Sequence, residues 1–261
     1  MQLWKNTPGF CEEIPKIEYY PPQTAPSDAA IVIFPGGGYG GRSPHEGKGY
    51  AEFLADAGVH AFVVDYRVAP HRFPLPLLDA RRAVRWVRAH ATEYGIDKNK
   101  IAVMGSSAGG HLAALVSNYA APIEYEGIDE IDKESFCPNA QILCYPVICA
   151  PSSGVAHKGS YYNLLGGQDG ALENAVDPAL LVSGTTPPAF IWHTSDDNAV
   201  NVINSYRYGI ALREAGVPVE MHVFPKGAHG LGLAYKQPHV AQWSSLLLTW
   251  LRYNDWLKHE L

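Results

Sequence analysis

The stretch Ile-Ala-Val-Met-Gly-Ser-Ser-Ala-Gly-Gly at residues 101–110 carries the clearest structural signal in the chain. Its apolar residues 101–104 predict a buried strand, and the alanine- and leucine-rich residues 108–120 predict a helix. Residues 105–109 fit the pattern Gly-x-Ser-x-Gly with Ser107 at its centre. Between a strand and a helix, this pattern predicts a sharp turn that exposes the Ser107 hydroxyl as a nucleophile. The alternative interpretation is an ordinary serine that caps a helix.

Short β-branched runs alternate with longer amphipathic stretches on both sides of this turn, which is typical of βαβ units on a parallel sheet. We predict strands at residues 29–34, 60–65, 101–104, 140–145, 189–193 and 219–224, and residues 14–22 are considered as a further edge strand. We predict helices at residues 45–57, 77–90, 108–120, 200–215 and 240–258. In the second of these helices four arginines lie opposite the apolar stripe and are interpreted as a solvated face.

A serine hydroxyl is a weak nucleophile unless a base takes its proton. The loops that follow parallel strands gather at one edge of a sheet, so the base is sought after the other strands. Asp196 and Asp197 follow the strand at 189–193, and His229 follows the strand at 219–224. The order of serine, aspartate and histidine along the chain is that of α/β-hydrolases. We expect His229 to be the base and one of the two aspartates to orient it, while His193, within a strand, is interpreted as a packing or surface residue.

A glycine-rich run at residues 36–41 follows the first parallel strand. Glycines at this place let backbone N–H groups turn toward a developing oxyanion, together with the N–H of Ala108 after the nucleophile. The spacing of Gly36, Gly38 and Gly41 also fits the pattern of a dinucleotide-binding loop, which we consider the weaker interpretation. The phosphate-loop pattern Gly-x-x-x-x-Gly-Lys-Ser/Thr is absent, and we expect no cofactor.

The composition bounds the class of protein. Hydrophobic residues make up 47% of the 261 residues, so a large core can be buried, and we expect a single domain over residues 1–261. Its doubly wound, mostly parallel sheet should have about six to eight strands. Two long stretches, residues 122–138 and 146–188, interrupt the alternation. We expect both to be excursions over the edge of the sheet that carries Ser107.

The charge pattern argues against some partners. The net charge of −6 does not suit a nucleic-acid-binding protein, which normally presents a basic face. No apolar stretch approaches the roughly 18 residues that span a bilayer, and we see no secretory signal. The cysteines lack Cys-x-x-Cys spacing, so we expect reduced cysteines and a cytoplasmic location. We expect no metal site, because neither a His-Glu-x-x-His pattern nor a Cys/His cluster occurs.

Five landmarks together give the chain a family resemblance: Pro-Gly-Gly-Gly-Tyr at 35–39, Asp-Tyr-Arg-Val-Ala-Pro at 65–70 followed by Phe-Pro at 73–74, the serine turn at 105–113, Pro-Pro-Ala-Phe at 187–190 leading to His-Thr-Ser-Asp-Asp at 193–197, and His-Gly at 229–230. With these landmarks the chain resembles the α/β-hydrolase superfamily. Within it, the chain is similar to hormone-sensitive-lipase-like esterases and to acetylxylan and feruloyl esterases. The resemblance covers nearly the whole chain.

The resemblance implies specific roles. Gly37 and Gly38 would be the oxyanion glycines, and Asp197 would be the triad acid, although Asn201 stands where the family often has proline. Pro35 precedes the glycines where lipase-like members usually have histidine. The chain also lacks the long N-terminal helical cap of that branch. We therefore expect no large cap domain and an open site that suits a polar, bulky alcohol.

These features predict a serine esterase that removes short acyl groups, acetyl above all, from sugars or xylo-oligosaccharides through an acyl-enzyme. The expected partner is a small-molecule or oligosaccharide ester, with no nucleic acid and no membrane, and a homo-oligomer is left open. One alternative keeps the triad but changes the leaving group, as in an arylformamidase or a small peptidase. Another is a non-catalytic binding protein that retains the fold.

Overall fold

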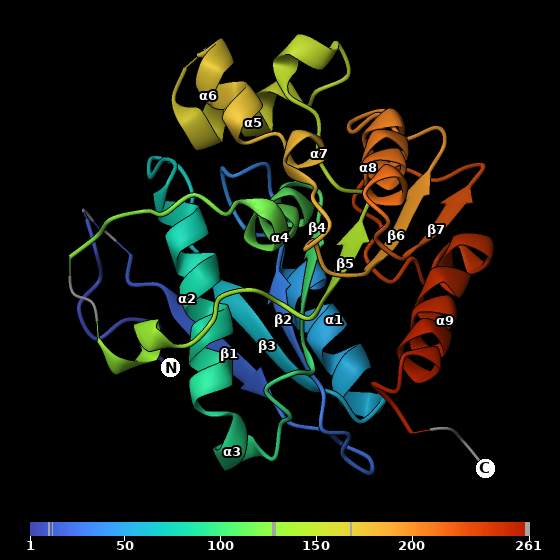
Figure 1. Ribbon diagram of the computed structural model, residues 1–261. Coiled ribbons are helices and arrows are strands. Elements are labelled where there is room, and N and C mark those ends of the chain that lie inside the picture. Colours follow the sequence, from blue (N-terminus) through green and yellow to red (C-terminus); the bar gives the residue numbers. More distant parts are fainter. Residues whose placement is uncertain (10, 12, 127–128, 168, 259–261) are drawn as a thin grey trace.

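Seven strands of the computed structural model pair into one sheet (Figure 1), and the structure describes residues 1–9, 11, 13–126, 129–167 and 169–258. The strand order is β1-β3-β2-β4-β5-β6-β7, and only the pairing of β1 with β3 is antiparallel. The bounds are β1 Lys16–Tyr20, β2 Ala30–Phe34, β3 His60–Asp65, β4 Ile101–Ser106, β5 Ala140–Cys144, β6 Ala189–Thr194 and β7 Val219–Phe224. The predicted mostly parallel sheet is confirmed, and the edge strand considered within residues 14–22 is present.

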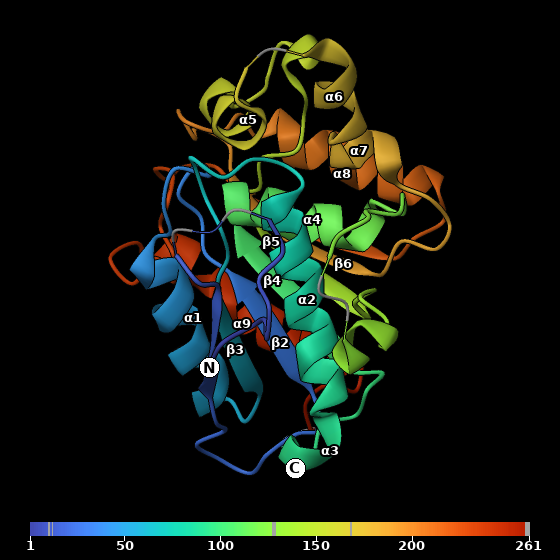
Figure 2. The ribbon, with the colours of Figure 1, turned by 90° about the vertical axis from the view of Figure 1, so that its left-hand side faces the viewer.

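Helices cover both faces of the sheet (Figure 2). Helices α2, α4 and α8 pack on the face that carries Val32 and Val103, and α1 and α9 pack on the face that carries Ile31 and Met104. Because neighbouring residues of one strand enter opposite cores, the central strands are apolar throughout. The bounds are α1 Pro44–Asp56, α2 Leu75–Ala89, α3 Ala91–Tyr94, α4 Ala108–Asn118, α5 Lys158–Leu165, α6 Gly170–Ala175, α7 Pro178–Leu181, α8 Ile203–Glu214 and α9 Pro238–Tyr253, with short 3-10 turns at Glu130–Lys133 and Pro151–Ser153.

The strand order reverses between β2 and β4, because the chain leaves β2 toward β3 and leaves β4 toward β5. In a parallel sheet the loops at the carboxyl ends beside such a reversal leave a crevice where ligands bind. The glycine-rich run follows β2 and Ser107 follows β4, so both lie at this reversal. Helices α5, α6 and α7, from the stretch 146–188, lie beyond the same ends of the strands (Figures 1 and 2).

The arginine face of α2 is not solvated, contrary to the prediction. Arg82 is 1% exposed and donates to carboxylate oxygens of Asp129 and Asp132 at 2.7–2.9 Å. Arg88 is also buried and donates to the backbone carbonyl of Cys137. Periodicity alone could not find this, because the acidic partners come from a separate segment more than 40 residues away in the sequence.

The expected course of residues 122–138 is therefore also wrong. Their described part, including the 3-10 turn Glu130–Lys133, packs along α2 and not over the edge that carries Ser107 (Figure 1). The ion pairs with the α2 arginines hold it there. Among the described residues, no helix is both long and apolar enough to cross a bilayer.

Candidate active site

The turn after β4 holds Ser107 in a strained backbone conformation, with φ 53° and ψ −120°. The two glycines of the pattern are required by close contacts. A Cβ on Gly105 would lie 2.1 Å from the carbonyl oxygen of Gly109, and a Cβ on Gly109 would lie 2.0 Å from that of Phe34. The strand therefore turns directly into α4, whose N-terminus lies under the serine and favours negative charge there.

The loops after β4, β6 and β7 bring three predicted side chains together. Nε2 of His229 lies 2.8 Å from Oγ of Ser107, and Nδ1 of His229 lies 2.7 Å from Oδ2 of Asp197. The Asp197 side chain is fully buried, whereas that of His229 is 22% exposed. In this arrangement the imidazole can take the serine proton while the carboxylate fixes its tautomer.

Asp197 is held from several sides. Its Oδ1 accepts the backbone amides of Ala199 and Val200, both at 2.9 Å, while Nε2 of His193 lies 3.4 Å from its Oδ2. Burial alone would raise the pKa of Asp197, but the hydrogen bonds from His193, His229 and Val200 outweigh it and hold the pKa well below its usual range. The carboxylate is therefore ionised and ready to orient His229.

The neighbouring carboxylate has a different contact. Asp196 is exposed, and its Oδ1 accepts the backbone amide of Gly227 at 2.7 Å, in the loop that carries His229. Thr194 donates to the carbonyl of the same glycine. Of the two candidates that the residues alone left open, Asp197 contacts the imidazole and Asp196 fastens the histidine loop.

Of the two interpretations of His193, a packing or a surface residue, the structure confirms packing, since the side chain is completely buried in β6. Its Nε2 donates to the carbonyl of Val200, and its Nδ1 pairs with the hydroxyl of Ser205 at 2.7 Å. It thereby fixes the turn that carries Asp197. The sequence carries no signal for this contact, because a buried histidine in a strand has many possible partners.

The first amide of the glycine-rich run is not available to an oxyanion, because the N–H of Gly36 donates to the carboxylate of Glu46. Gly37 and Gly38 follow with φ values of 133° and 63°, and a Cβ on Gly37 would lie 2.3 Å from the carbonyl oxygen of Gly41. Within the described ranges, the amides of Gly37 and Gly38 make no hydrogen bond. The amide of Ala108 is the first of α4, where no carbonyl of the helix can accept it.

Helix α5 contacts the glycine-rich run through a hydrogen bond. Nδ2 of Asn163 donates to the carbonyl of Gly38 at 2.9 Å. His157, at the start of α5, accepts the amide of Ser160, and its pKa is lowered by burial and then by the nearby charge of His229. Neither Asn163 nor His157 could be predicted to lie near the site, because the stretch 146–188 shows no regular pattern from which a helix could be predicted.

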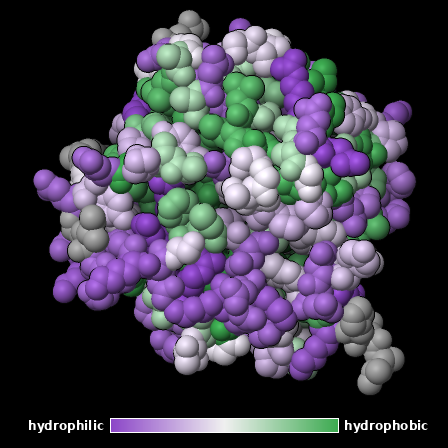
Figure 3. All heavy atoms as spheres, viewed as in Figure 1, coloured by the Kyte–Doolittle hydropathy of each residue, from purple (hydrophilic) through white to green (hydrophobic). Residues whose placement is uncertain are grey.

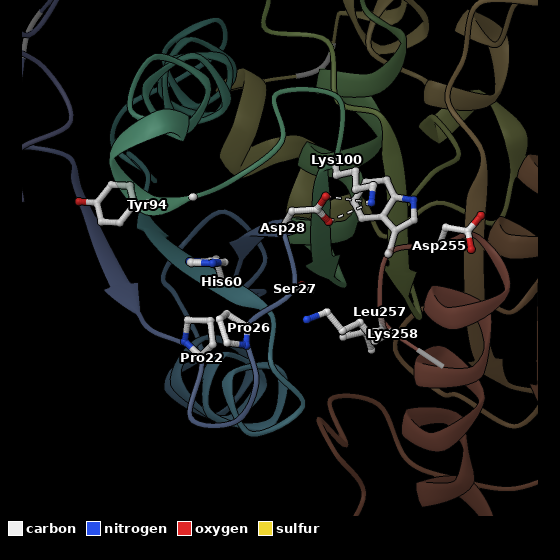
Figure 4. A pocket seen from close by; sticks show the side chains of 12 residues that line it. Pro22, Pro26, Ser27, Asp28, His60, Tyr94, Lys100, Asp255, Leu257 and Lys258 are labelled. Atoms are coloured by element: carbon white, nitrogen blue, oxygen red, sulfur yellow. Dashed lines mark hydrogen bonds and ion pairs between the residues drawn. The ribbon is translucent and has the colours of Figure 1, made fainter. Parts of the chain in front are cut away.

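A hollow of about 820 Å³ lies away from this site. Its lining residues include Asp28, His60 and Lys100, which stand at the amino ends of β2, β3 and β4, opposite to Ser107 (Figure 4). A smaller hollow of about 500 Å³ lies beside the histidine loop, lined by His45, Gly230 and seven further residues.

Hydrophilic and hydrophobic residues are unevenly distributed over the viewed face of the molecule (Figure 3). Figure 3 shows hydrophilic residues concentrated on the lower half of the viewed face, with hydrophobic ones more frequent near α5 to α8. In the part of the chain that the structure describes, no group of three or more His, Cys, Asp or Glu side chains is arranged to hold a metal ion.

The chain matches two family models and several curated proteins. The family described as BD-FAE matches residues 18–211, and the prolyl oligopeptidase family matches residues 169–255. The chain is 35% identical over 247 residues to an acetylxylan esterase of Xylanibacter ruminicola, which covers 90% of this chain and 45% of that protein. It is 36% identical over 217 residues to endo-1,4-beta-xylanase B of Butyrivibrio fibrisolvens, covering 78% of this chain and 32% of that protein. The chain thus spans less than half the length of these two relatives.

A solved structure is similar over nearly its full length. The acetyl ester-xyloside bifunctional hydrolase of Caldicellulosiruptor lactoaceticus superimposes with a TM-score of 0.92 at 40% sequence identity, covering 98% of this chain and 96% of that one. The sequence match over residues 18–211 and the superposition support the same assignment. The chain belongs to the BD-FAE family and has the α/β-hydrolase fold.

Proposed function

We propose that this protein is a serine esterase that removes short acyl groups, acetyl above all, from sugars or xylo-oligosaccharides. The observation that carries the proposal is the continuous chain of hydrogen bonds from Ser107 through His229 to Asp197. The relatives named as an acetylxylan esterase and an acetyl ester-xyloside hydrolase support the choice of acyl group and alcohol. The four free cysteines suit a cytoplasmic location, which we also propose.

The reaction follows from the positions of the side chains. Oγ of Ser107 attacks the ester carbonyl carbon while Nε2 of His229 takes the hydroxyl proton. The carbonyl oxygen becomes an oxyanion, for which the amides of Gly37, Gly38 and Ala108 are the available donors. The intermediate collapses, the bond to the alcohol breaks, and His229 gives its proton to the leaving oxygen. An acyl group is then left on Ser107.

The second half repeats these steps with water. His229 takes a proton from a water molecule that attacks the acyl carbon, and a second tetrahedral intermediate forms at the same amides. Its collapse releases the carboxylic acid and returns the proton from His229 to Ser107. Throughout, Asp197 holds the proton of the imidazole on Nδ1 and stabilises the imidazolium, without itself taking the proton.

The experiment compares Ser107→Ala with the parent enzyme on p-nitrophenyl acetate, then assays acetylated xylo-oligosaccharide, feruloyl ester and N-formyl arylamine. Ser117→Ala, on the helix that follows Ser107, is the control, since its hydroxyl donates to the carbonyl of Ala113 within that helix. Loss of the nucleophile should lower turnover by about a millionfold. An S107A enzyme within tenfold of the parent would refute the proposal.

The substrate panel tests the choice of leaving group. We expect the acetylated sugar to be hydrolysed with the highest kcat/KM. Faster hydrolysis of the N-formyl arylamine would favour an amidase, an outcome that the match of residues 169–255 to the prolyl oligopeptidase family makes worth testing. That stretch contains both Asp197 and His229.

A further inference from the structure

Glu46 is a buried carboxylate that takes no part in the proposed chemistry. It lies in the first turn of α1, and its side chain is 3% exposed. Its Oε2 accepts the amide of Gly36 at 2.9 Å, and its Oε1 accepts the hydroxyl of Tyr145 at 2.6 Å. The Tyr145 oxygen in turn accepts the amide of Gly232 at 3.0 Å. One carboxylate thus connects the start of the glycine-rich run to the loop that carries His229.

A buried carboxylate is costly when no cation compensates it. Among the described residues, the basic group recorded within 4 Å of Glu46 is the mostly exposed His45, whose Nε2 lies 3.9 Å away and donates to the carbonyl of Gly230. The N-terminus of α1 favours the charge only in part. Two hydrogen bonds, from the amide of Gly36 and from the hydroxyl of Tyr145, therefore hold this buried side chain in place.

The packing around Gly36 is tight, so a shift of the Glu46 side chain would also move the backbone of the glycine-rich run. A Cβ on Gly36 would lie 2.5 Å from Oε2 of Glu46, 2.8 Å from the carbonyl oxygen of Ser106 and 3.2 Å from Cβ of Ser107. Gly36 is therefore enclosed between the carboxylate and the turn that carries the nucleophile. The next amide in the chain is that of Gly37, so its direction depends on how the peptide before it is held.

The other end of the network lies against the base. The ring of Tyr145 meets that of His229 edge to face, with centroids 5.0 Å apart and an interplanar angle of 70°. Tyr145 has a φ of 37°, and burial raises the pKa of its hydroxyl, which therefore keeps its proton and donates to Glu46. The hydroxyl of Tyr50 lies 3.2 Å from that of Tyr145 and 2.9 Å from Oγ of Ser106, which extends the network to the nucleophile strand.

We propose that Glu46 is a positioning residue that holds the glycine-rich run and the His229 loop in a fixed relation to each other, so that the oxyanion amides and the base face the same reacting carbon. The proposal rests on the proposed function, because it concerns how the same site is built. It adds a role for a residue that contacts neither the substrate nor the reacting atoms.

The experiment measures kcat and KM on p-nitrophenyl acetate, and the affinity for a phenylboronic acid, in Glu46→Ala, Glu46→Gln and Tyr145→Phe. The boronate forms a tetrahedral adduct with the serine, so its affinity reports on the oxyanion amides without turnover. Glu52→Ala is the matched control, since it removes an exposed carboxylate from the same helix. Thermal unfolding of every variant shows whether the fold is retained.

We expect E46A to lower kcat about a hundredfold with KM nearly unchanged, and to weaken the boronate by a similar factor, as for loss of an oxyanion donor. E46Q should retain kcat within about tenfold, because its carbonyl can still accept the Gly36 amide and its NH₂ can donate to the Tyr145 oxygen once the Tyr145 hydroxyl turns to Tyr50, which keeps the bridge. Y145F, which keeps the bond to Gly36, should lie between the two. E52A should match the parent.

Three results would overturn the inference while leaving the esterase proposal intact. These are an E46A enzyme within threefold of the parent, an E46A enzyme with low kcat but parental boronate affinity, and an E46Q enzyme as impaired as E46A, which would assign the effect to charge. If E46A does not fold, E46Q and Y145F still decide the matter by their order. An active S107A enzyme would instead refute the proposed function.

Discussion

Replacing Asp197 by asparagine should reverse the tautomer of His229. Oδ1 of Asp197 accepts two backbone amides at 2.9 Å, so the asparagine must keep its carbonyl oxygen in that place. Its NH₂ group then takes the position of Oδ2, 2.7 Å from Nδ1 of His229. Nδ1 can only accept from this donor, so the imidazole proton moves to Nε2. There it faces Oγ of Ser107, and the ring can no longer take the serine proton.

A base in the wrong tautomer costs about 10⁴-fold in turnover, which is about 5.4 kcal/mol in activation free energy. The assay is kcat/KM on p-nitrophenyl acetate at neutral pH, with Asp196→Asn beside it. An asparagine at 196 can still accept the Gly227 amide, so D196N should lose less than about tenfold. A D197N enzyme within a hundredfold of the parent, or a larger loss in D196N, would refute this assignment of the acid.

Three further outcomes follow from the packing. Gly37→Ala should lower kcat by at least about a hundredfold, since the added Cβ would overlap the carbonyl oxygen of Gly41. Gly49→Ala, in α1, is the control and should leave kcat unchanged, because its Cβ would meet no other atom within 4 Å. Equal kinetics of the two variants would contradict the role of the glycine-rich run. Burial lowers the pKa of His111 to about 4, so the unfolded chain binds a proton below about 6.5 that the native state excludes, and stability falls as pH falls from about 6.5 to 4. Urea midpoints of His111→Gln should therefore change less over this range than those of the parent, and parallel curves would show that His111 does not contribute. Arg82→Ala removes the arginine that pairs with Asp129 and one of the two that pair with Asp132, and it should lower the free energy of unfolding by about 3 kcal/mol. Lys133→Ala, in an exposed pair, should change it by less than about 1 kcal/mol. Similar urea curves for the two variants would contradict the buried pairing.

The sequence predicted those parts of the fold whose signal is local. The predicted bounds of all six parallel strands agree with the structure to within two residues at each end. The central strands carry the clearest signal, because strands covered on both faces need a continuous apolar segment. Ser107 could be found because its turn requires glycines two residues away on either side. His229 followed from topology, since the loops after parallel strands share one edge of the sheet.

The parts that could not be predicted depend on contacts between distant segments. The arginines of α2 look solvated by periodicity, and only the return of the chain along that helix shows that Arg82 is buried. The sequence of α5 has no regular hydrophobic pattern, so the contact of Asn163 with the glycine-rich run could not be predicted. Glu46 has the sequence context of an ordinary helix residue, and its partners Gly36 and Tyr145 lie in loops that are distant from it in the sequence.

The central claim is that Ser107 becomes acylated, and one measurement tests it directly. The enzyme is mixed with excess p-nitrophenyl acetate, quenched in acid within the first turnovers, digested and mapped by mass spectrometry. We predict an acetyl group on the peptide that contains Ser107, and on the side chain of that residue. Steady turnover with the acetyl group on another residue, or on none, would contradict the account.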